Sequence, residues 1–160
     1  MATQLSNIAK TSFRPSTRPQ GPAIKYPFTL AVATAPALGD ILKLGKIPVG
    51  ATLLEFFIDI PDLDTDATGA VSIEVGDNGS SARFLAATTA PKTARTVVST
   101  TVITASQMLG TIAGTLPRLY ATGGDLRITI AVASLALSAA VTIRGWYEYT
   151  MFPTRKDFGQ

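Results

Sequence analysis

The stretch that decides the fold runs from Asp40 to Asp77 and reads DILKLGKIPVGATLLEFFIDIPDLDTDATGAVSIEVGD. Three apolar runs lie in it, at residues 41–44, 52–60 and 71–75. A Pro-Val-Gly-Ala corner at residues 48–51 separates the first two runs, and an aspartate-rich turn at residues 62–69 separates the last two. Short β-prone runs punctuated by Gly, Pro and Asp predict antiparallel hairpins.

The composition limits the chemistry that this chain performs. It has 160 residues, of which 46% are hydrophobic and 16% are charged, a size that suits one domain with its own core. Cysteine and histidine are both absent, which excludes disulfides, thiolate zinc sites and histidine-based catalysis. The acidic pair Glu55 and Asp59 would lie about 13 Å apart along a strand, too far apart for paired glycosidase carboxylates. We therefore expect no enzyme, no catalytic residue and no cofactor.

Residues 1–25 form a segment distinct from the rest of the chain. Its charged residues are all basic, namely Lys10, Arg14, Arg18 and Lys25, and its prolines at 15, 19 and 22 disfavour a helix or a central strand. The net charge of +3 comes from this segment, because the remaining residues hold ten basic and eleven acidic side chains. We predict an extended N-terminal arm that binds a partner protein through Leu5, Ile8, Phe13 and Arg14. The alternatives are a disordered terminus and phosphate binding, and four charges give nucleic acid only weak, salt-sensitive affinity.

Further strands are expected on both sides of the opening stretch. They cover residues 26–32, 95–104, 117–121, 126–132 and 139–151, whereas residues 81–87 are ambiguous between a helical turn and an irregular strand. Pro27 indicates that the first of these strands lies at a sheet edge or that the proline is among the strand's first residues. Eight or nine strands without an amphipathic helix predict an all-β fold. We expect a single antiparallel, jelly-roll-like β-sandwich of about eight strands over residues 26–152, and an exposed tail over residues 153–160.

No segment of the sequence predicts contact with a membrane. Residues 1–25 are polar and basic and do not resemble a signal peptide. The most apolar stretch, residues 128–143, is interrupted by Ser134, Ser138 and Thr142 and lacks the roughly 18 continuous apolar residues of a spanning helix. The low charge of the chain instead suggests that part of its surface is buried against partner proteins.

The aspartate-rich turn is the one candidate metal site in the sequence. Asp62, Asp64 and Asp66 match the opening of an EF-hand calcium loop. The pattern then departs from that loop, since Ala67 stands where the glycine is required and Ile73 stands in place of the bidentate glutamate. A solvated hairpin turn is the simpler interpretation, and a weak calcium site is the alternative.

The stretch from Ile41 to Leu85 resembles small structural proteins of tailed-bacteriophage virions. The resemblance consists of four short segments, Pro48-Val49-Gly50-Ala51, Asp62-Leu63-Asp64, Val75-Gly76-Asp77 and Arg83-Phe84-Leu85. It covers less than a third of the chain and is a pattern of turns. It implies a capsid decoration (cement) or other minor head protein, made in the host cytoplasm and placed on the capsid exterior. It also implies a homo-oligomer, with a trimer expected, that contacts the major capsid protein.

Two other functions remain open at this point. One is a tail-tube or head–tail connector component, which ring assembly would distinguish from a small closed oligomer. The other is a receptor- or carbohydrate-binding module that uses Trp146, Tyr147 and Tyr149. Because Trp146 is offset by one residue from the two tyrosines, a strand would place it on the opposite face, which favours packing over a shared sugar platform.

Overall fold

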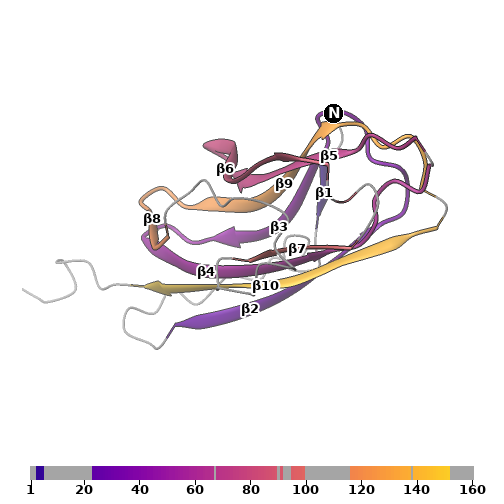
Figure 1. Ribbon diagram of the computed structural model, residues 1–160. Helices are drawn as coiled ribbons and strands as arrows, with labels where there is room; N and C mark the ends of the chain where they lie inside the picture. Colours follow the sequence, from indigo (N-terminus) through magenta and orange to yellow (C-terminus); the bar gives the residue numbers. More distant parts are fainter. Residues whose placement is uncertain are drawn as a thin grey trace, which may run out of the picture.

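The computed structural model describes residues 3–5, 23–66, 68–89, 91, 95–99, 116–137 and 139–151. The regular structure of these residues consists of ten strands (Figure 1). The strands are β1 (Thr3–Leu5), β2 (Ile24–Val32), β3 (Ile41–Ile47), β4 (Ala51–Ile60), β5 (Ser72–Asp77), β6 (Ser80–Thr88), β7 (Thr96–Ser99), β8 (Arg118–Tyr120), β9 (Gly124–Val132) and β10 (Val141–Met151). No helix in this part of the chain is long and apolar enough to span a membrane.

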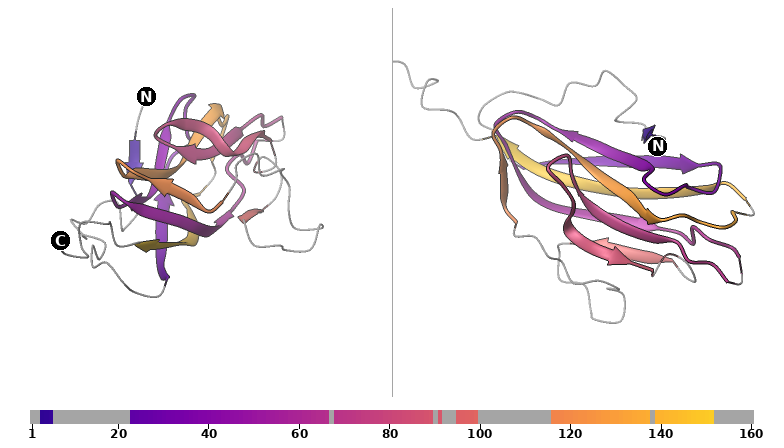
Figure 2. Two further views of the ribbon diagram at one scale, coloured as in Figure 1. Left: turned by 90° about the vertical axis from the view of Figure 1, so that its left-hand side faces the viewer. Right: turned by 90° about the horizontal axis from the view of Figure 1, so that it is seen from above.

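The strands form two sheets that pack face to face (Figure 2). Sheet A has the order β1-β3-β9-β5-β6, and sheet B has the order β2-β10-β4-β7, with β8 also pairing with β4. Apart from β1 and β8, the strands pair first with last: β2 with β10, β3 with β9, β4 with β7, and β5 with β6, all antiparallel. Successive pairs alternate between the two sheets, as in a long hairpin that has been rolled up. This topology is a jelly roll, so the predicted all-β sandwich is confirmed.

The core lies between the sheets and follows from the alternation of side chains along each strand. In β2, Tyr26, Phe28, Leu30 and Val32 are buried, and the residues between them are exposed. In β9, Leu126, Ile128 and Ile130 face the same core from the other sheet. Each large apolar side chain that is fully buried contributes about 1.5–3 kcal/mol, so the two inner faces hold the sheets together.

The connections gather at two ends of the sandwich. We call one the leucine end; it consists of residues 33–40, 61–66 and 133–137, and hydrogen bonds from Ser134 to Pro36 and from Thr65 to Ala136 join its loops. We call the other the arginine end; it consists of residues 48–50, 78–79 and 118–123, and the Gly50 N–H donates to the Tyr120 carbonyl there. In Figure 1 the leucine end is on the right and the arginine end, marked by β8, is on the left.

The structure adds three details to the predicted elements. Residues 81–87, which were ambiguous, belong to strand β6. Strand β2 lies at an edge of sheet B, which is one of the two positions that Pro27 indicated. Strand β1 lies within the predicted arm and was not foreseen, because a three-residue strand has neither a turn nor an alternating pattern to announce it. Of the strand predicted at residues 95–104, the described part is β7.

Candidate interaction surfaces

The N-terminal arm is described only at β1. This strand pairs in parallel with β3, in the register Thr3 to Ile41 and Leu5 to Lys43, and it covers the outer edge of sheet A. Of the four arm residues predicted to bind a partner, only the backbone of Leu5 is placed. The other three, Ile8, Phe13 and Arg14, lie outside the described residues, as does the tail over residues 153–160. Their role therefore stays a prediction.

Asp64 is the centre of the aspartate-rich turn and is almost completely buried, at 1% exposed. Its carboxylate accepts hydrogen bonds from the backbone N–H groups of Ala70 at 3.0 Å, and of Leu135 and Ala136 at 3.2 Å. Burial alone raises the pKa of Asp64, but these hydrogen bonds outweigh it and hold the pKa below its ordinary value of 3.8. Asp64 thus joins two loops of the leucine end.

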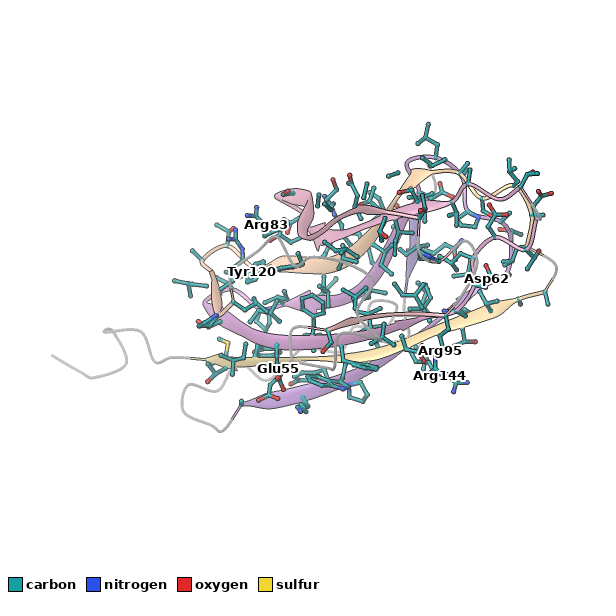
Figure 3. All side chains as sticks on the ribbon, viewed as in Figure 1. Glu55, Asp62, Arg83, Arg95, Tyr120 and Arg144 are labelled. Carbon is teal, nitrogen blue, oxygen red and sulfur yellow. The ribbon has the colours of Figure 1, made fainter. Side chains whose placement is uncertain are left out.

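The two neighbouring aspartates serve their own turns. The Asp62 Oδ1 accepts the N–H of Asp64 at 3.0 Å, and the Asp66 Oδ1 accepts the N–H of Thr68 at 2.7 Å. Within the described ranges, no group of three or more acidic side chains is arranged to hold a metal ion. These local hydrogen bonds support the interpretation of a hairpin turn, and the calcium site stays a prediction. Asp62 is labelled in Figure 3.

Two of the three loops of the leucine end form an apolar patch. Its loops at residues 33–39 and 133–140 contain no charged side chain. Leu38 and Leu135 are 67% and 60% exposed there, although both belong to segments that backbone hydrogen bonds fix in place. Exposed leucines on loops that carry no charge favour contact with another protein surface. The exposed aspartate of this end, Asp66, lies on its third loop, residues 61–66.

The arginine end is organised by the buried carboxylate of Asp77. Its Oδ2 accepts the Tyr120 hydroxyl at 2.9 Å and lies 2.7 Å from Nε of Arg83 and 3.3 Å from Nε of Arg118. Its Oδ1 accepts the backbone N–H of Gly79 at 2.9 Å, which closes the β5–β6 turn. Burial raises the pKa of Asp77, but the bonds from Arg83, Tyr120 and the turn outweigh it and lower the pKa overall.

This arrangement fastens three separate segments of the chain. Asp77 ends β5, Arg83 lies in β6, and Arg118 and Tyr120 lie in β8, which pairs with sheet B. Figure 3 shows Arg83 and Tyr120 close together at this end of the molecule. In the sequence, Asp77 is distinguished only as the last residue of the segment Val75-Gly76-Asp77. Its partners Arg118 and Tyr120 follow 41 and 43 positions later in the chain, so no local sequence pattern links them to Asp77.

The outer face of sheet B carries an aromatic pair under a layer of ion pairs. Trp146 stacks on Phe57 with ring centroids 6.3 Å apart, and the Lys25 Nζ lies 3.9 Å from the centroid of the Trp146 ring. Lys25 also pairs with Glu55 at 3.2 Å and with Glu148 at 3.5 Å. The hydrogen bond with Glu55 raises the pKa of Lys25. Because Lys25 occupies one face of the indole ring, Trp146 does not offer that face to a sugar.

The predicted split of the aromatic residues in β10 is confirmed. Trp146 faces outward, whereas Tyr147 and Tyr149 are buried between the sheets. The two tyrosines stack with Tyr26 of β2, at centroid distances of 5.7 Å and 5.2 Å. They belong to the core and not to a common binding face with Trp146. The acidic pair considered above is also engaged, since Asp59 accepts two hydrogen bonds of 2.6 Å from Arg95.

The two-sheet topology defines a small jelly-roll protein. Solved structures with a similar fold include a chain of the capsid of Ralstonia phage GP4, with a TM-score of 0.71 and 22% sequence identity over 96% of this chain and 100% of that chain. A chain of the cyanophage Pam1 capsid asymmetric unit is also similar, with a TM-score of 0.56 and 21% identity over 88% of this chain and 94% of that chain. No protein-family model matches the chain, and no curated protein sequence matches it. At these identities the likeness shows a shared fold.

Proposed function

We propose that this protein is a non-enzymatic structural component of a bacteriophage virion that binds the outside of the capsid and stabilises it. The observation that carries the proposal is the shared jelly roll with chains from two phage capsids, matched over nearly the whole length of each. The sequence resemblance to phage virion proteins was drawn from turns alone, and it points to the same setting. Neither observation depends on the other.

The extent of the match favours a decoration protein. Since the 160-residue chain covers 100% and 94% of the similar chains, each of those chains is itself little more than this one jelly roll. A small domain without additional layers is suited to sit on an existing shell as an accessory subunit. Such binding stabilises the assembled shell by mass action, because attachment favours the closed state over the opened one.

The surfaces of the domain supply candidate contacts for this role. The apolar patch of the leucine end, with Leu38 and Leu135 exposed, is our candidate for the face that meets the major capsid protein. We further propose that the subunits form a homotrimer, which light scattering after size exclusion measures directly. A large ring or an open polymer would instead indicate a connector or tail-tube component.

The proposal is tested on particles of the phage that encodes this chain. Virions with and without the protein are heated and osmotically shocked, and release of the packaged DNA is followed by dye fluorescence. We expect the particles that lack the protein to release DNA at a lower temperature and after a milder shock. If the two kinds of particle resist heat and osmotic shock equally well, the decoration hypothesis is wrong.

A further inference from the structure

We infer that the arginine end holds a binding site for a carboxylate of another protein, formed by the guanidinium groups of Arg83 and Arg118. The occupant that this chemistry selects is an aspartate or glutamate side chain on the partner protein. The inference goes beyond the proposed function, which assigns the capsid contact to the leucine end, and it does not depend on that assignment.

The two arginines are not neutralised by the acid that they share. The Asp77 Oδ2 lies 2.7 Å from Nε of Arg83 and 3.3 Å from Nε of Arg118, so two positive groups lie beside one negative group. Within the described part of the chain, no other acidic side chain forms an ion pair with either arginine. One positive charge of the cluster therefore remains for a ligand.

The positive groups of this cluster are also the ones that face solvent. The Asp77 side chain is 2% exposed, whereas the side chains of Arg83 and Arg118 are 26% and 36% exposed. Because the Nε atoms of both arginines are buried, the N–H donors that can reach a ligand are those of the Nη groups. A guanidinium presents such donors as a planar fork that matches the two oxygens of a carboxylate.

A groove beside these groups gives a ligand room. It has a volume of about 220 Å³ and lies between the β5–β6 turn, at Asn78 and Gly79, and residues 118–123. Arg118 lines the groove directly. An added Cβ at Gly79 would lie 3.0 Å from Nη2 of Arg83, so the second guanidinium lies against the wall that this turn forms. Since a water molecule takes about 30 Å³ of liquid volume, the groove has room for a carboxyl group and the methylene groups that carry it.

The surroundings of the groove favour a protein as the source of the carboxylate. Leu119 lines the groove and is 62% exposed. Val49, which is 65% exposed, lines a second groove of about 380 Å³. The two grooves share Asn78, Thr122 and Gly123 and are therefore continuous. Exposed apolar side chains next to arginine are typical of protein–protein interfaces, in which arginine is enriched.

The charge of this end is too small for a nucleic acid. A phosphate backbone is bound through many neutralised phosphates, and few contacts give weak, salt-sensitive affinity. Beside the one positive charge left by the Asp77 cluster, Lys46 adds a second in the neighbouring groove. Asp125 lines that groove too, but it pairs with Lys43 at 2.8 Å, so its charge is balanced. Two charges suit a short acidic segment of a protein.

The site is tested with two fluorescein-labelled peptides that differ only in charge. One contains two glutamates between two leucines, the other has glutamines in place of the glutamates, and both are amidated at the C-terminus. Fluorescence anisotropy measures their binding to the full-length protein. We expect the glutamate peptide to bind at least about tenfold more tightly, because hydrogen bonds from a guanidinium to a charged carboxylate are stronger than those to a neutral amide. Equal binding of the two peptides, or binding of neither, would overturn the inference.

A matched pair of variants then locates the bound peptide. Arg118→Gln is expected to weaken binding of the glutamate peptide at least about fivefold, since it removes one of the two forks. Arg144→Gln removes the same charge from an exposed position of β10 and should leave the affinity unchanged. Equal losses in the two variants would mean that the peptide responds to net charge alone, which contradicts a site at the arginine end.

A measurement on the unmodified protein does not depend on the folding of a variant. Phenylglyoxal reacts with accessible guanidinium groups, and mass spectrometry locates the modified residues. Saturating glutamate peptide should slow the modification of Arg83 and Arg118 and leave that of Arg144 unchanged. The inference is wrong if Arg83 and Arg118 are not protected, or if a double-stranded DNA oligonucleotide protects them better than the peptide does. Either result leaves the test of particle stability, and with it the proposed function, unaffected.

Discussion

The hydroxyl of Tyr147 in sheet B donates a 2.9 Å hydrogen bond to the backbone carbonyl of Lys46 in sheet A. The bond crosses the sandwich, and burial raises the pKa of the tyrosine, so the hydroxyl stays protonated and able to donate. The ring reaches Lys46 by passing over Gly45, where an added Cβ would lie only 2.7 Å from the ring carbon Cζ. A glycine is therefore required at this point of β3.

The replacement Gly45→Ala is expected to destabilise the fold by about 1–3 kcal/mol, because the new methyl group forces the Tyr147 ring out of its position. Urea denaturation followed by tyrosine and tryptophan fluorescence measures this change. The matched control is Lys46→Ala, which removes an exposed side chain and keeps the carbonyl, so it is expected to cost less than about 0.5 kcal/mol. Equal stability of Gly45→Ala and the unmodified protein would contradict the close approach.

Acid is expected to weaken the fold through Asp64 and Asp77. The pKa of each is lowered in the folded state, so the unfolded chain binds more protons between the folded value and the ordinary value of 3.8. The contribution of these groups is complete above about pH 5 and is lost as the pH falls through their folded-state pKa values. The free energy of unfolding, measured in urea from pH 7 to pH 2.5, should decline over the acid part of that range.

The variant Asp64→Asn isolates one of the two groups. It removes an acceptor oxygen from the N–H groups that converge there, which is expected to cost about 1–3 kcal/mol at pH 7 and to flatten the acid dependence. Asp62→Asn retains its Oδ1 acceptor for the Asp64 N–H and serves as the control, with a change under about 0.5 kcal/mol. An unchanged pH profile in Asp64→Asn would contradict the role given to this carboxylate.

Removal of the Asp77 carboxylate should loosen the arginine end. Asp77→Ala leaves the guanidinium groups of Arg83 and Arg118 without their shared acceptor, and a loss of about 3 kcal/mol is expected. Tyr120→Phe removes one hydrogen bond to the same carboxylate and is expected to cost about 1 kcal/mol. Guanidinium chloride unfolding of both variants gives the comparison. If the two variants lose similar amounts of unfolding free energy, the ion pairs of Arg83 and Arg118 with Asp77 contribute little to stability.

The two ends of the sandwich allow a matched test of capsid attachment. The double variant Leu38→Glu/Leu135→Glu places two charges on the leucine end, and Val49→Glu/Leu119→Glu places two on the arginine end. All four side chains are at least 60% exposed, so both variants should keep the stability of the unmodified protein within about 1 kcal/mol. Co-sedimentation with capsids that lack the protein should fall at least tenfold for the first variant only. The opposite pattern would move the capsid contact to the arginine end.

The sequence predicted those features of the fold that local patterns determine. The alternation in residues 126–132 marked β9, and Pro27 marked an edge strand. The order of the strands could not be predicted from local patterns, because the pairing of β2 with β10 joins residues more than 100 positions apart. The same reason applies to Asp77, whose contacts with β8 depend on the completed sandwich.

The candidate surfaces were predicted only in part. The outward position of Trp146 followed from its offset relative to Tyr147, but its cover by Lys25 required the pairing of β2 with β10. The apolar patch of the leucine end was not predicted, although both of its loops are rich in alanine in the sequence. Only the fold brings residues 33–39 and 133–137 together into one surface.

The central claim, that this protein binds and stabilises a phage capsid, is tested most directly by adding the purified protein back to particles that lack it. The measured quantity is the temperature at which the particles release DNA, as a function of added protein. We predict saturable binding to a fixed number of sites and a release temperature that rises to that of complete virions. Particles that bind no protein, or that bind it without any rise in release temperature, would contradict the account.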